Sequence, residues 1–214
     1  MLHTKGCWFE SDRKYFRTVG LDCDKIYMRR FFTSDTHFFH KNIIRLSNRP
    51  FADVKEMHDT IVNNWNRVVL PEDEVYHIGD FSFGSRKQTH EILDRLMGKV
   101  HLVYGNHDQV VRKNKELQDR FVWCKEIHEL KIPDENAHRG EQKIVLCHYA
   151  MRVWNKSHHG AWHLYGHSHG SLPEDPNALS FDVGVDPNGF KLVDLDDVAA
   201  RMKLKKFVPV DHHE

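Results

Sequence analysis

The stretch KVHLVYGNHD, residues 99–108, decides the fold, because a run of apolar side chains ends abruptly in a glycine and three polar residues. Such an apolar run is typical of a buried strand, and the polar cluster after it is typical of a loop. The same pattern recurs in residues 27–37, 74–80, 143–150, 161–169 and 179–186. Each segment is interpreted as a buried strand that stops at a loop.

Two segments between the early strands have the spacing of amphipathic helices. In residues 53–69 the apolar positions recur three or four apart behind Asp53, a residue type that caps helices. Residues 86–97 repeat this spacing. The first half of the chain therefore predicts a parallel sheet with crossover helices. A last amphipathic segment, residues 194–206, begins with acids and ends with bases, and is expected to pack on the sheet.

The composition is typical of a soluble globular chain. We expect a single domain over residues 28–214, preceded by an extension, residues 1–27, of unknown role. The first residues lack the apolar core of a secretory signal, and nothing resembles a membrane span, so a cytoplasmic protein without a membrane partner is predicted. The four cysteines show no C-x-x-C spacing and are assigned no chemistry.

The charge balance bears on the partners. Lysine plus arginine and aspartate plus glutamate number 31 each, so the chain has no global positive field to gather long polyanions. A small phosphorylated, nucleotide-like partner is therefore favoured over long nucleic acid, while the oligomeric state is left open. The 18 histidines exceed what a solvated surface needs, which indicates a chemical role for some of them.

Side chains that bind metals gather at the predicted strand ends. They belong to a set of nine polar residues, Asp35, His37, Asp80, Asn106, His107, Asp108, His148, His167 and His169, of which seven are candidate ligands. In open α/β sheets the loops at the carboxyl ends of the strands converge, so these residues are expected to meet. Imidazole nitrogen and carboxylate oxygen suit a divalent transition metal, whereas a structural zinc site more often recruits cysteine. Seven ligands exceed the needs of one catalytic metal but suit two metals that share a carboxylate and clamp a phosphate.

The motif order D-x-H, G-D, G-N-H-D, H and G-H-x-H, spread over residues 31–190, resembles that of the calcineurin-like metallophosphoesterase superfamily. The resemblance implies an α/β fold, a four-layer αββα sandwich of two mixed β-sheets flanked by helices, with a dinuclear metal site at the carboxyl ends of the strands. It also implies two divalent ions, with manganese favoured and iron, zinc, nickel or cobalt as alternatives.

Carried over by position, the resemblance also assigns the site residues. Asp35, His37 and His169 would hold the first metal, and Asn106, His148 and His167 the second. Asp80 would bridge both metals, while His107 would be the acid or phosphate contact with Asp108 behind it. A histidine beside a metal ligand can protonate a leaving alkoxide, and a neighbouring carboxylate can orient it, which agrees with these catalytic roles.

The reaction expected from this family is hydrolysis of a phosphodiester, cyclic or small-nucleotide, by a hydroxide activated by two metals. The alternatives are a phosphomonoesterase or a nuclease of the same fold, and a non-catalytic metal-binding interaction module. A module that had lost the chemistry should have broken ligand positions, and here every position is filled.

Local stretches such as SDTHFFHKNII, NRPF and HYAMRVWN resemble those of small bacterial and phage phosphoesterases, in which glycine is expected where Phe39 stands. Phe81 and Ser82 after the bridging aspartate depart from the pattern of protein serine/threonine phosphatases.

Three further residues are candidates for substrate binding. Arg152 and Trp154, between the fourth and fifth motifs, could supply a cation for phosphate and an aromatic wall for a base. Trp154 could equally be tucked under a solvated loop. His40, after the first motif, could reach the substrate or belong only to the next helix, for which Asn42 is the expected cap.

Overall fold

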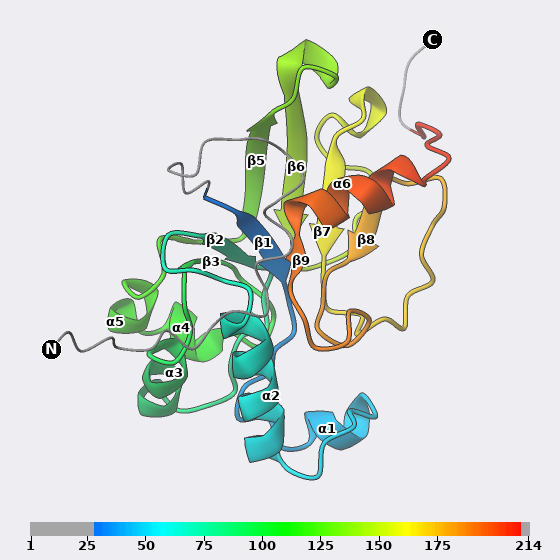
Figure 1. Ribbon diagram of the computed structural model, residues 1–214. Coiled ribbons are helices and arrows are strands. Elements are labelled where there is room, and N and C mark those ends of the chain that lie inside the picture. Colours follow the sequence, from blue (N-terminus) through cyan, green and yellow to red (C-terminus); the bar gives the residue numbers. More distant parts are fainter. Residues whose placement is uncertain (1–27, 211–214) are drawn as a thin grey trace, which may run out of the picture.

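The computed structural model describes residues 28–210 and contains two β-sheets (Figure 1). The first sheet has the order β4-β3-β2-β1-β9. Its strands are β1 (Arg30–Thr33), β2 (Glu74–His77), β3 (Lys99–Val103), β4 (Cys124–Lys125) and β9 (Val193–Asp194). Strands β1 to β4 are parallel, and β9 runs antiparallel to β1. The parallel core is the sheet that the alternation of strands and helices predicted.

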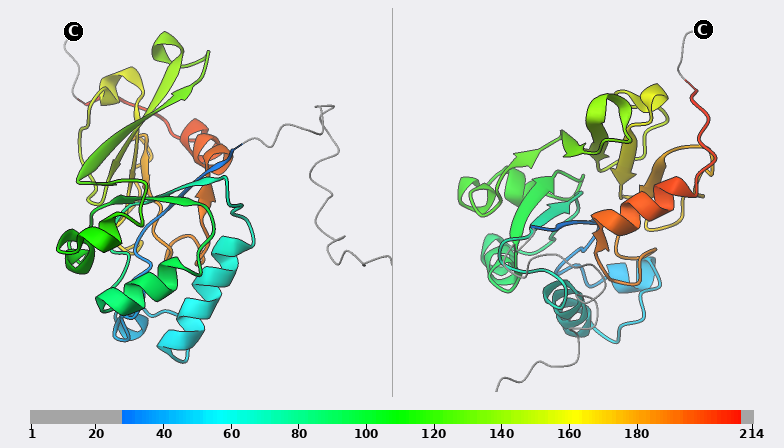
Figure 2. Two further views of the ribbon diagram at one scale, coloured as in Figure 1. Left: turned by 90° about the vertical axis from the view of Figure 1, so that its left-hand side faces the viewer. Right: turned by 45° about the horizontal axis from the view of Figure 1, so that its top comes forward.

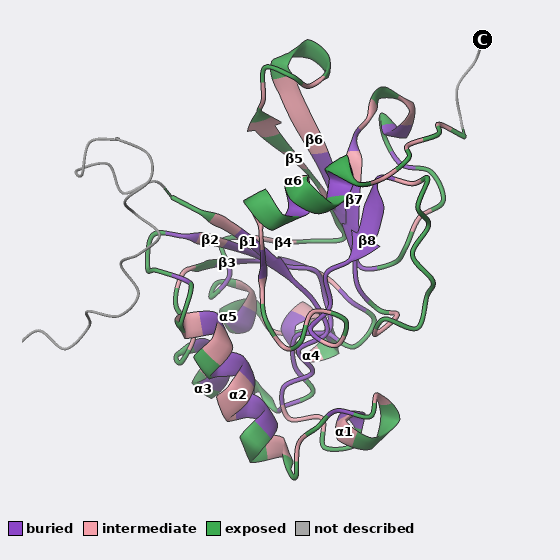
Figure 3. Cartoon of the chain, turned by 45° about the vertical axis from the view of Figure 1, so that its right-hand side comes forward, coloured by how far each residue is buried: buried purple, intermediate pink, exposed green. Residues whose placement is uncertain are grey.

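Five helices lie together on one side of this sheet (Figure 1). They are α1 (Ile43–Leu46), α2 (Val54–Asn66), α3 (Arg86–Leu93), α4 (Gln109–Arg112) and α5 (Lys115–Gln118). Helix α2 begins as predicted, because Asp53 accepts the backbone N–H of Glu56 at 2.8 Å. Its Met57 and Trp65 are fully buried, and Figure 3 shows this buried side of the helix. Asn42 stands at the N-cap position of α1 but makes no capping hydrogen bond through its side chain.

The second sheet has the order β5-β6-β7-β8. Its strands are β5 (Ile127–Pro133), β6 (Glu141–Cys147), β7 (Trp162–Tyr165) and β8 (Ser180–Asp182). Strand β5 is antiparallel to β6, and β6, β7 and β8 are parallel. Two single-turn 3₁₀ helices, η2 (His138–Gly140) and η3 (Ser157–His159), lie side by side near the tip of the β5–β6 hairpin (Figure 2).

The two sheets pack face to face. Phe32 and Val103 of the first sheet meet Leu146, Leu164 and Phe181 of the second in one buried core. Helix α6 (Leu195–Lys203) adds two side chains to this core at the open side between the sheets, Val198 and Met202. The predicted last helix therefore packs on the sheets as expected.

The loop of residues 149–161, which contains η3, packs on the outer face of the second sheet. Trp154 from this loop packs on His163 of β7, with ring centroids 5.2 Å apart. The expected α/β architecture, two mixed sheets flanked by helices, is confirmed, and its fourth layer is largely loop. The expected extension, residues 1–27, lies outside the described residues. No helix within residues 28–210 is long and apolar enough to cross a membrane.

Candidate metal centre

Backbone hydrogen bonds hold the loops at the strand ends together. The N–H groups of Asp35 and His37 donate to the carbonyls of Gly79 and Asp80, both at 3.0 Å. The hydroxyl of Ser34 donates to Ile78 at 2.7 Å. The loops therefore meet as closely as the convergence of parallel strands predicted.

Gly166 allows the loop that carries His167 and His169 to lie close to the loop that carries Asp35. A Cβ atom on Gly166 would overlap Ser34 Oγ and Asp35 Oδ2. Because no side chain stands there, the backbone N–H of His167 reaches Asp35 Oδ2 and donates to it at 2.9 Å. The glycine before the two histidines thus allows the loop of the second sheet to dock on the loop of the first.

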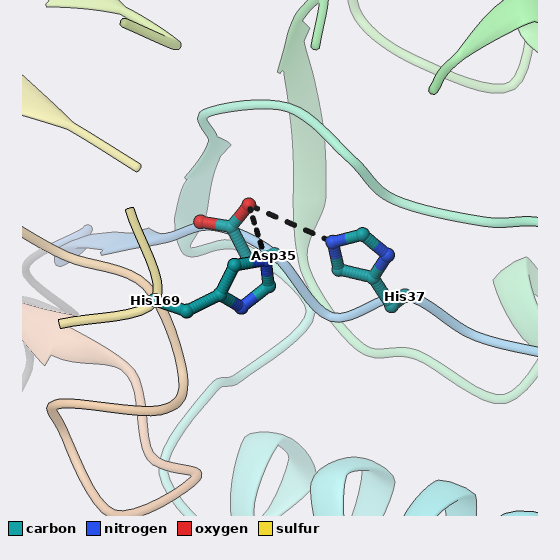
Figure 4. A group of neighbouring side chains, drawn as sticks. All are labelled: Asp35, His37 and His169. Atoms are coloured by element: carbon teal, nitrogen blue, oxygen red, sulfur yellow. Dashed lines mark ion pairs between the residues drawn. The ribbon is translucent and has the colours of Figure 1, made fainter. Parts of the chain in front are cut away.

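Asp35, His37 and His169 form a first group of metal-binding side chains (Figure 4). Asp35 Oδ1 lies 3.8 Å from His37 Nε2 and 4.0 Å from His169 Nε2. Asp35 Oδ1 and His37 Nε2 are both buried and have no hydrogen-bond partner among the described residues. Buried polar atoms are rarely left without a partner, so this pair of orphaned atoms fits a cation between them.

Asp80, His148 and His167 form a second group next to the first. Within it, His148 Nε2 lies 3.2 Å from Asn106 Oδ1, which adds the amide to the same cluster. Asp80 connects the two groups, because its Oδ2 lies 3.5 Å from His37 Nε2 and 3.5 Å from His148 Nε2. All seven side chains predicted as ligands are thereby brought together, with a buried carboxylate between the two groups.

The Nδ1 atoms of two histidines are held by the protein, which leaves Nε2 free to bind a metal. His148 Nδ1 lies 2.8 Å from the carbonyl of Ile78, and His169 Nδ1 lies 2.7 Å from Asp186 Oδ2. Such outer contacts fix the ring orientation and the tautomer of metal-binding histidines.

A model of the calcineurin-like phosphoesterase superfamily domain matches residues 28–181. The chain belongs to the calcineurin-like phosphoesterase superfamily. This membership supports a metal-dependent phosphoesterase, a hydrolase of phosphoester bonds.

Two relatives and one solved structure are similar to this phosphoesterase. An uncharacterized protein of Methanocaldococcus jannaschii is 31% identical over 191 residues, covering 86% of this chain and 94% of that protein. The gene 66 protein of Mycobacterium phage L5 is 30% identical over 190 residues, covering 78% and 90%. A crystal structure of an Aquifex aeolicus protein of unknown function has a TM-score of 0.60 at 23% identity, covering 81% and 99%. That structure supports the fold alone.

Arg49 and Asp186 are site residues of the phosphoesterase that the motif pattern missed. Arg49 donates to both carboxylate oxygens of Asp186, each at 2.8 Å, and to the backbone carbonyls of Thr36 and Asp35. Asp186 in turn contacts His169. The sequence does contain a signal for Asp186. It ends the apolar run of residues 179–186, just as the expected ligands follow the other apolar runs.

Five of the expected ligands have left-handed backbone conformations. Their φ angles are 57° for Asp35, 49° for His37, 56° for Asp80, 67° for His167 and 48° for His169. Non-glycine residues rarely adopt such angles, and they cluster at functional sites when they do. The turns that follow the strands therefore aim these side chains inward at a conformational cost.

The contacts of Asp108 differ from the expected role of orienting the His107 ring. Its buried carboxylate accepts the backbone N–H groups of Asp80 at 2.9 Å, Phe81 at 2.8 Å and Gly105 at 2.8 Å. Burial raises the pKa of Asp108 to about 6, although the backbone donors oppose this effect. These contacts correct the expectation, since Asp108 fastens the turn that carries Asp80 to the next loop.

His107 and His40 line one open cavity of about 560 Å³ together with the expected ligands His37, Asp80, His167 and His169. The backbone N–H of His107 donates to Asp80 Oδ1 at 2.8 Å, which places its ring at the rim of the site. Phe83 packs against both rings, with centroids 3.9 Å from His40 and 4.6 Å from His107. His40 therefore stands at the site, while its contact with a substrate remains a prediction.

Arg152 and Trp154 lie elsewhere. Trp154 is buried and donates its indole N–H to the carbonyl of Ala161 at 2.9 Å, so it is tucked under its own loop. Both residues line a different cavity, which shares no lining residue with the one at the ligands. An aromatic side chain beside the second ligand group is instead Tyr149, which is 48% exposed and packs against His148 and His167.

The electrostatics of the second group favour an ion pair when no metal is bound. Burial opposes charge on His148, but the carboxylates of Asp80 and Asp35 raise its pKa to about 9. Burial likewise opposes charge on Asp80, but His148 lowers its pKa to about 2. A metal must therefore displace a proton from His148, which makes metal binding dependent on pH.

Proposed function

We propose that this chain is a phosphodiesterase that hydrolyses small nucleotide-like substrates with two divalent cations, manganese first among them. The observation that carries the proposal is the position of Asp80 Oδ2, at 3.5 Å from a histidine of each ligand group. A single carboxylate shared by two groups of nitrogen and oxygen donors suits two neighbouring cations.

The residues present fit such cations. Asp35, His37 and His169 would hold one cation, Asn106, His148 and His167 the other, and Asp80 both. Bound there, the two cations would supply positive charge for a phosphate and water of lowered pKa for attack on phosphorus.

Three further residues around the expected ligands have separate tasks. His107 reaches the open cavity without belonging to either ligand group, so its ring is free to donate a proton to the leaving oxygen. Asp108 keeps the Asp80 turn in place through its three backbone contacts. Phe83 restrains the orientation of His107 by packing against it.

The size and composition of the cavity support a small substrate. About 560 Å³ lies within the usual range for small-molecule sites. The exposed ring of Tyr149 beside His167 offers a face on which a nucleobase can stack.

The test is the hydrolysis of two model substrates by protein reconstituted with manganese. Bis-p-nitrophenyl phosphate should be cleaved faster than p-nitrophenyl phosphate, and Asp80→Asn should abolish both reactions. Asp196→Asn, the same change at an exposed position of α6, is the matched control and should retain full activity.

Three outcomes separate the alternatives. Faster cleavage of the monoester would replace the proposal by a phosphomonoesterase. Cleavage of neither ester by a protein that holds manganese would favour a binding module. A panel of cyclic nucleotides, nucleoside monophosphates and short RNA then identifies the substrate class, and cleavage of the RNA alone would favour a nuclease.

A further inference from the structure

A second cavity, of about 160 Å³, lies at the opposite end of β6 from the metal centre. It is enclosed by the tip of the β5–β6 hairpin and by the loop around η3, which lie side by side in both views of Figure 2. Strand β6 starts at this cavity with Glu141 and ends immediately before His148. Seven strand residues span about 20 Å, so the cavity is separate from the catalytic cluster.

The walls of this cavity concentrate positive charge in a chain whose net charge is zero. Its permanent cations are Lys131, Arg139, Lys143 and Lys156, and its one carboxylate is Glu141. Lys131 pairs with Glu141 at 3.4 Å. The other three cations form no ion pair within residues 28–210, so the cavity keeps a net charge of +3.

The sheet places two of these cations directly opposite each other. Lys131 and Lys143 are register partners in the antiparallel β5–β6 pair, so their side chains extend from the same face. Like charges in this arrangement repel, and Glu141 compensates only one of them through its ion pair with Lys131. An anion held between the two ammonium groups would turn that repulsion into attraction.

Backbone strain marks the same place. Arg139 has a φ of 61° and Lys156 a φ of 64°, so both are non-glycine residues in the left-handed region. Among the residues described, such angles otherwise fall mainly on the metal-binding loops. Strain of this kind persists at sites where the position of a side chain matters.

Two imidazoles complete the wall. His138 of the hairpin tip stacks on His159 of the η3 loop, with ring centroids 4.5 Å apart and planes at 2°. Desolvation is the largest cause that lowers the pKa of His159, followed by the neighbouring imidazoles and then by the cations Lys156 and Arg139. A bound anion would counter that effect and allow the ring to donate a further hydrogen bond.

We infer that this cavity is a binding site for a phosphate dianion, held between Lys131, Lys143, Lys156 and Arg139. The dianion can come from free inorganic phosphate or from the terminal group of a phosphomonoester. The phosphate group of either ligand suits the volume of the cavity and is matched in charge by lysine and arginine. This site needs neither the metals nor the proposed hydrolysis.

The test uses the full chain freed of metal with a chelator, so that phosphate has no cation to bind at the catalytic cluster. Calorimetric titration at constant ionic strength with inorganic phosphate, and separately with adenosine monophosphate, distinguishes the two sources. Binding of at least one should weaken tenfold or more in K143Q/K156Q. The matched control K113Q/K206Q removes the same charge at two exposed positions and should bind like the original chain.

A second measurement locates the ligand. Phosphate should shift the ring C–H resonances of His138 and His159 in the original chain and leave them unmoved in K143Q/K156Q. Circular dichroism establishes that the variant is folded. The inference would be overturned if K143Q/K156Q bound phosphate and adenosine monophosphate as tightly as the original chain. It would also be overturned if K113Q/K206Q lost as much affinity, or if the original chain bound neither probe.

Discussion

Arg49 and Asp186, 137 residues apart in the chain, form a buried bidentate ion pair behind the first ligand group. The same Asp186 carboxylate contacts His169 Nδ1, and Arg49 also holds the backbone carbonyl of Asp35. One guanidinium therefore positions two of the three side chains expected at the first metal. A lysine cannot reproduce this, because it lacks the planar fork of donors.

Arg49→Lys should therefore lower the affinity for the first metal by about 10- to 100-fold, the usual effect of losing such an outer contact. Metal content after dialysis against limiting manganese measures the effect. Arg29→Lys is the control, because Arg29 also binds a buried carboxylate, Asp73, away from the metal centre. If the control lost as much metal as Arg49→Lys, general destabilisation would be the cause.

Substitution of the shared carboxylate should affect both metals. Asp80→Asn removes the charge that lies 3.5 Å from His37 and from His148, so metal content should fall from about two ions per chain toward none. Asp35→Asn, which changes a carboxylate of the first group only, should leave one ion bound. If Asp80→Asn kept one ion per chain, Asp80 would not be shared between the two metals.

His107→Ala should leave metal binding intact and slow turnover by roughly 10²- to 10⁴-fold for substrates with poor leaving groups, because general acid catalysis contributes by that amount. The p-nitrophenolate group needs little protonation, so bis-p-nitrophenyl phosphate should lose much less rate than a dinucleotide. Steady-state rates on the two substrates give the comparison. An equal loss on both would exclude His107 as the acid.

The stability of the metal-free chain should fall as pH decreases from about 6.5 to 4, partly because of His58. Its Nε2 accepts the backbone N–H of Phe39 at 2.7 Å, and burial lowers its pKa to about 4. Between these values the unfolded chain binds a proton that the folded chain does not, so acid favours unfolding. The contribution should reach about 2 kcal/mol at pH 4.5.

Urea unfolding at pH 7 and pH 4.5 measures this difference. His58→Gln keeps a neutral acceptor and should lose less stability on acidification than the original chain. His90→Gln, a half-exposed position of α3, is the control and should behave like the original chain. An unchanged pH dependence in His58→Gln would assign the effect to other groups.

The sequence predicts the metal centre better than the surroundings of the substrate. Asp35 and Asp80 could be placed because they follow β1 and β2, two parallel strands whose carboxyl ends lie at one edge of the same sheet, whatever the details of the loops. Trp154 could not, because sequence spacing does not tell on which side a loop folds back onto its sheet. The role of Asp186 could not be predicted, because it depends on contact with Arg49, a residue distant in the chain.

The fold, too, has parts that the sequence predicts and parts that it does not. Helix α2 followed from the spacing of residues such as Met57 and Trp65, which a core needs on one side. Strand β5 gave only a weak signal, because its residues alternate between exposed and half-buried positions and are ordered mainly by pairing with β6. Local sequence patterns therefore predict helices and strands that bury apolar side chains. A strand that is ordered mainly by pairing with its neighbour can be recognised only once the structure is known.

The left-handed backbone conformations at the expected ligands lower the stability of the fold, while they aim the side chains that the reaction needs. Each such residue costs about 1–2 kcal/mol relative to a relaxed backbone, and the rest of the fold must sustain that cost before any metal arrives. Glycine at His37 or His167 would relieve the strain and should make the metal-free chain more resistant to heat, while destroying the site. A search for thermostable variants of this chain, if made without selection for activity, would therefore tend to erase the residues that give it a function.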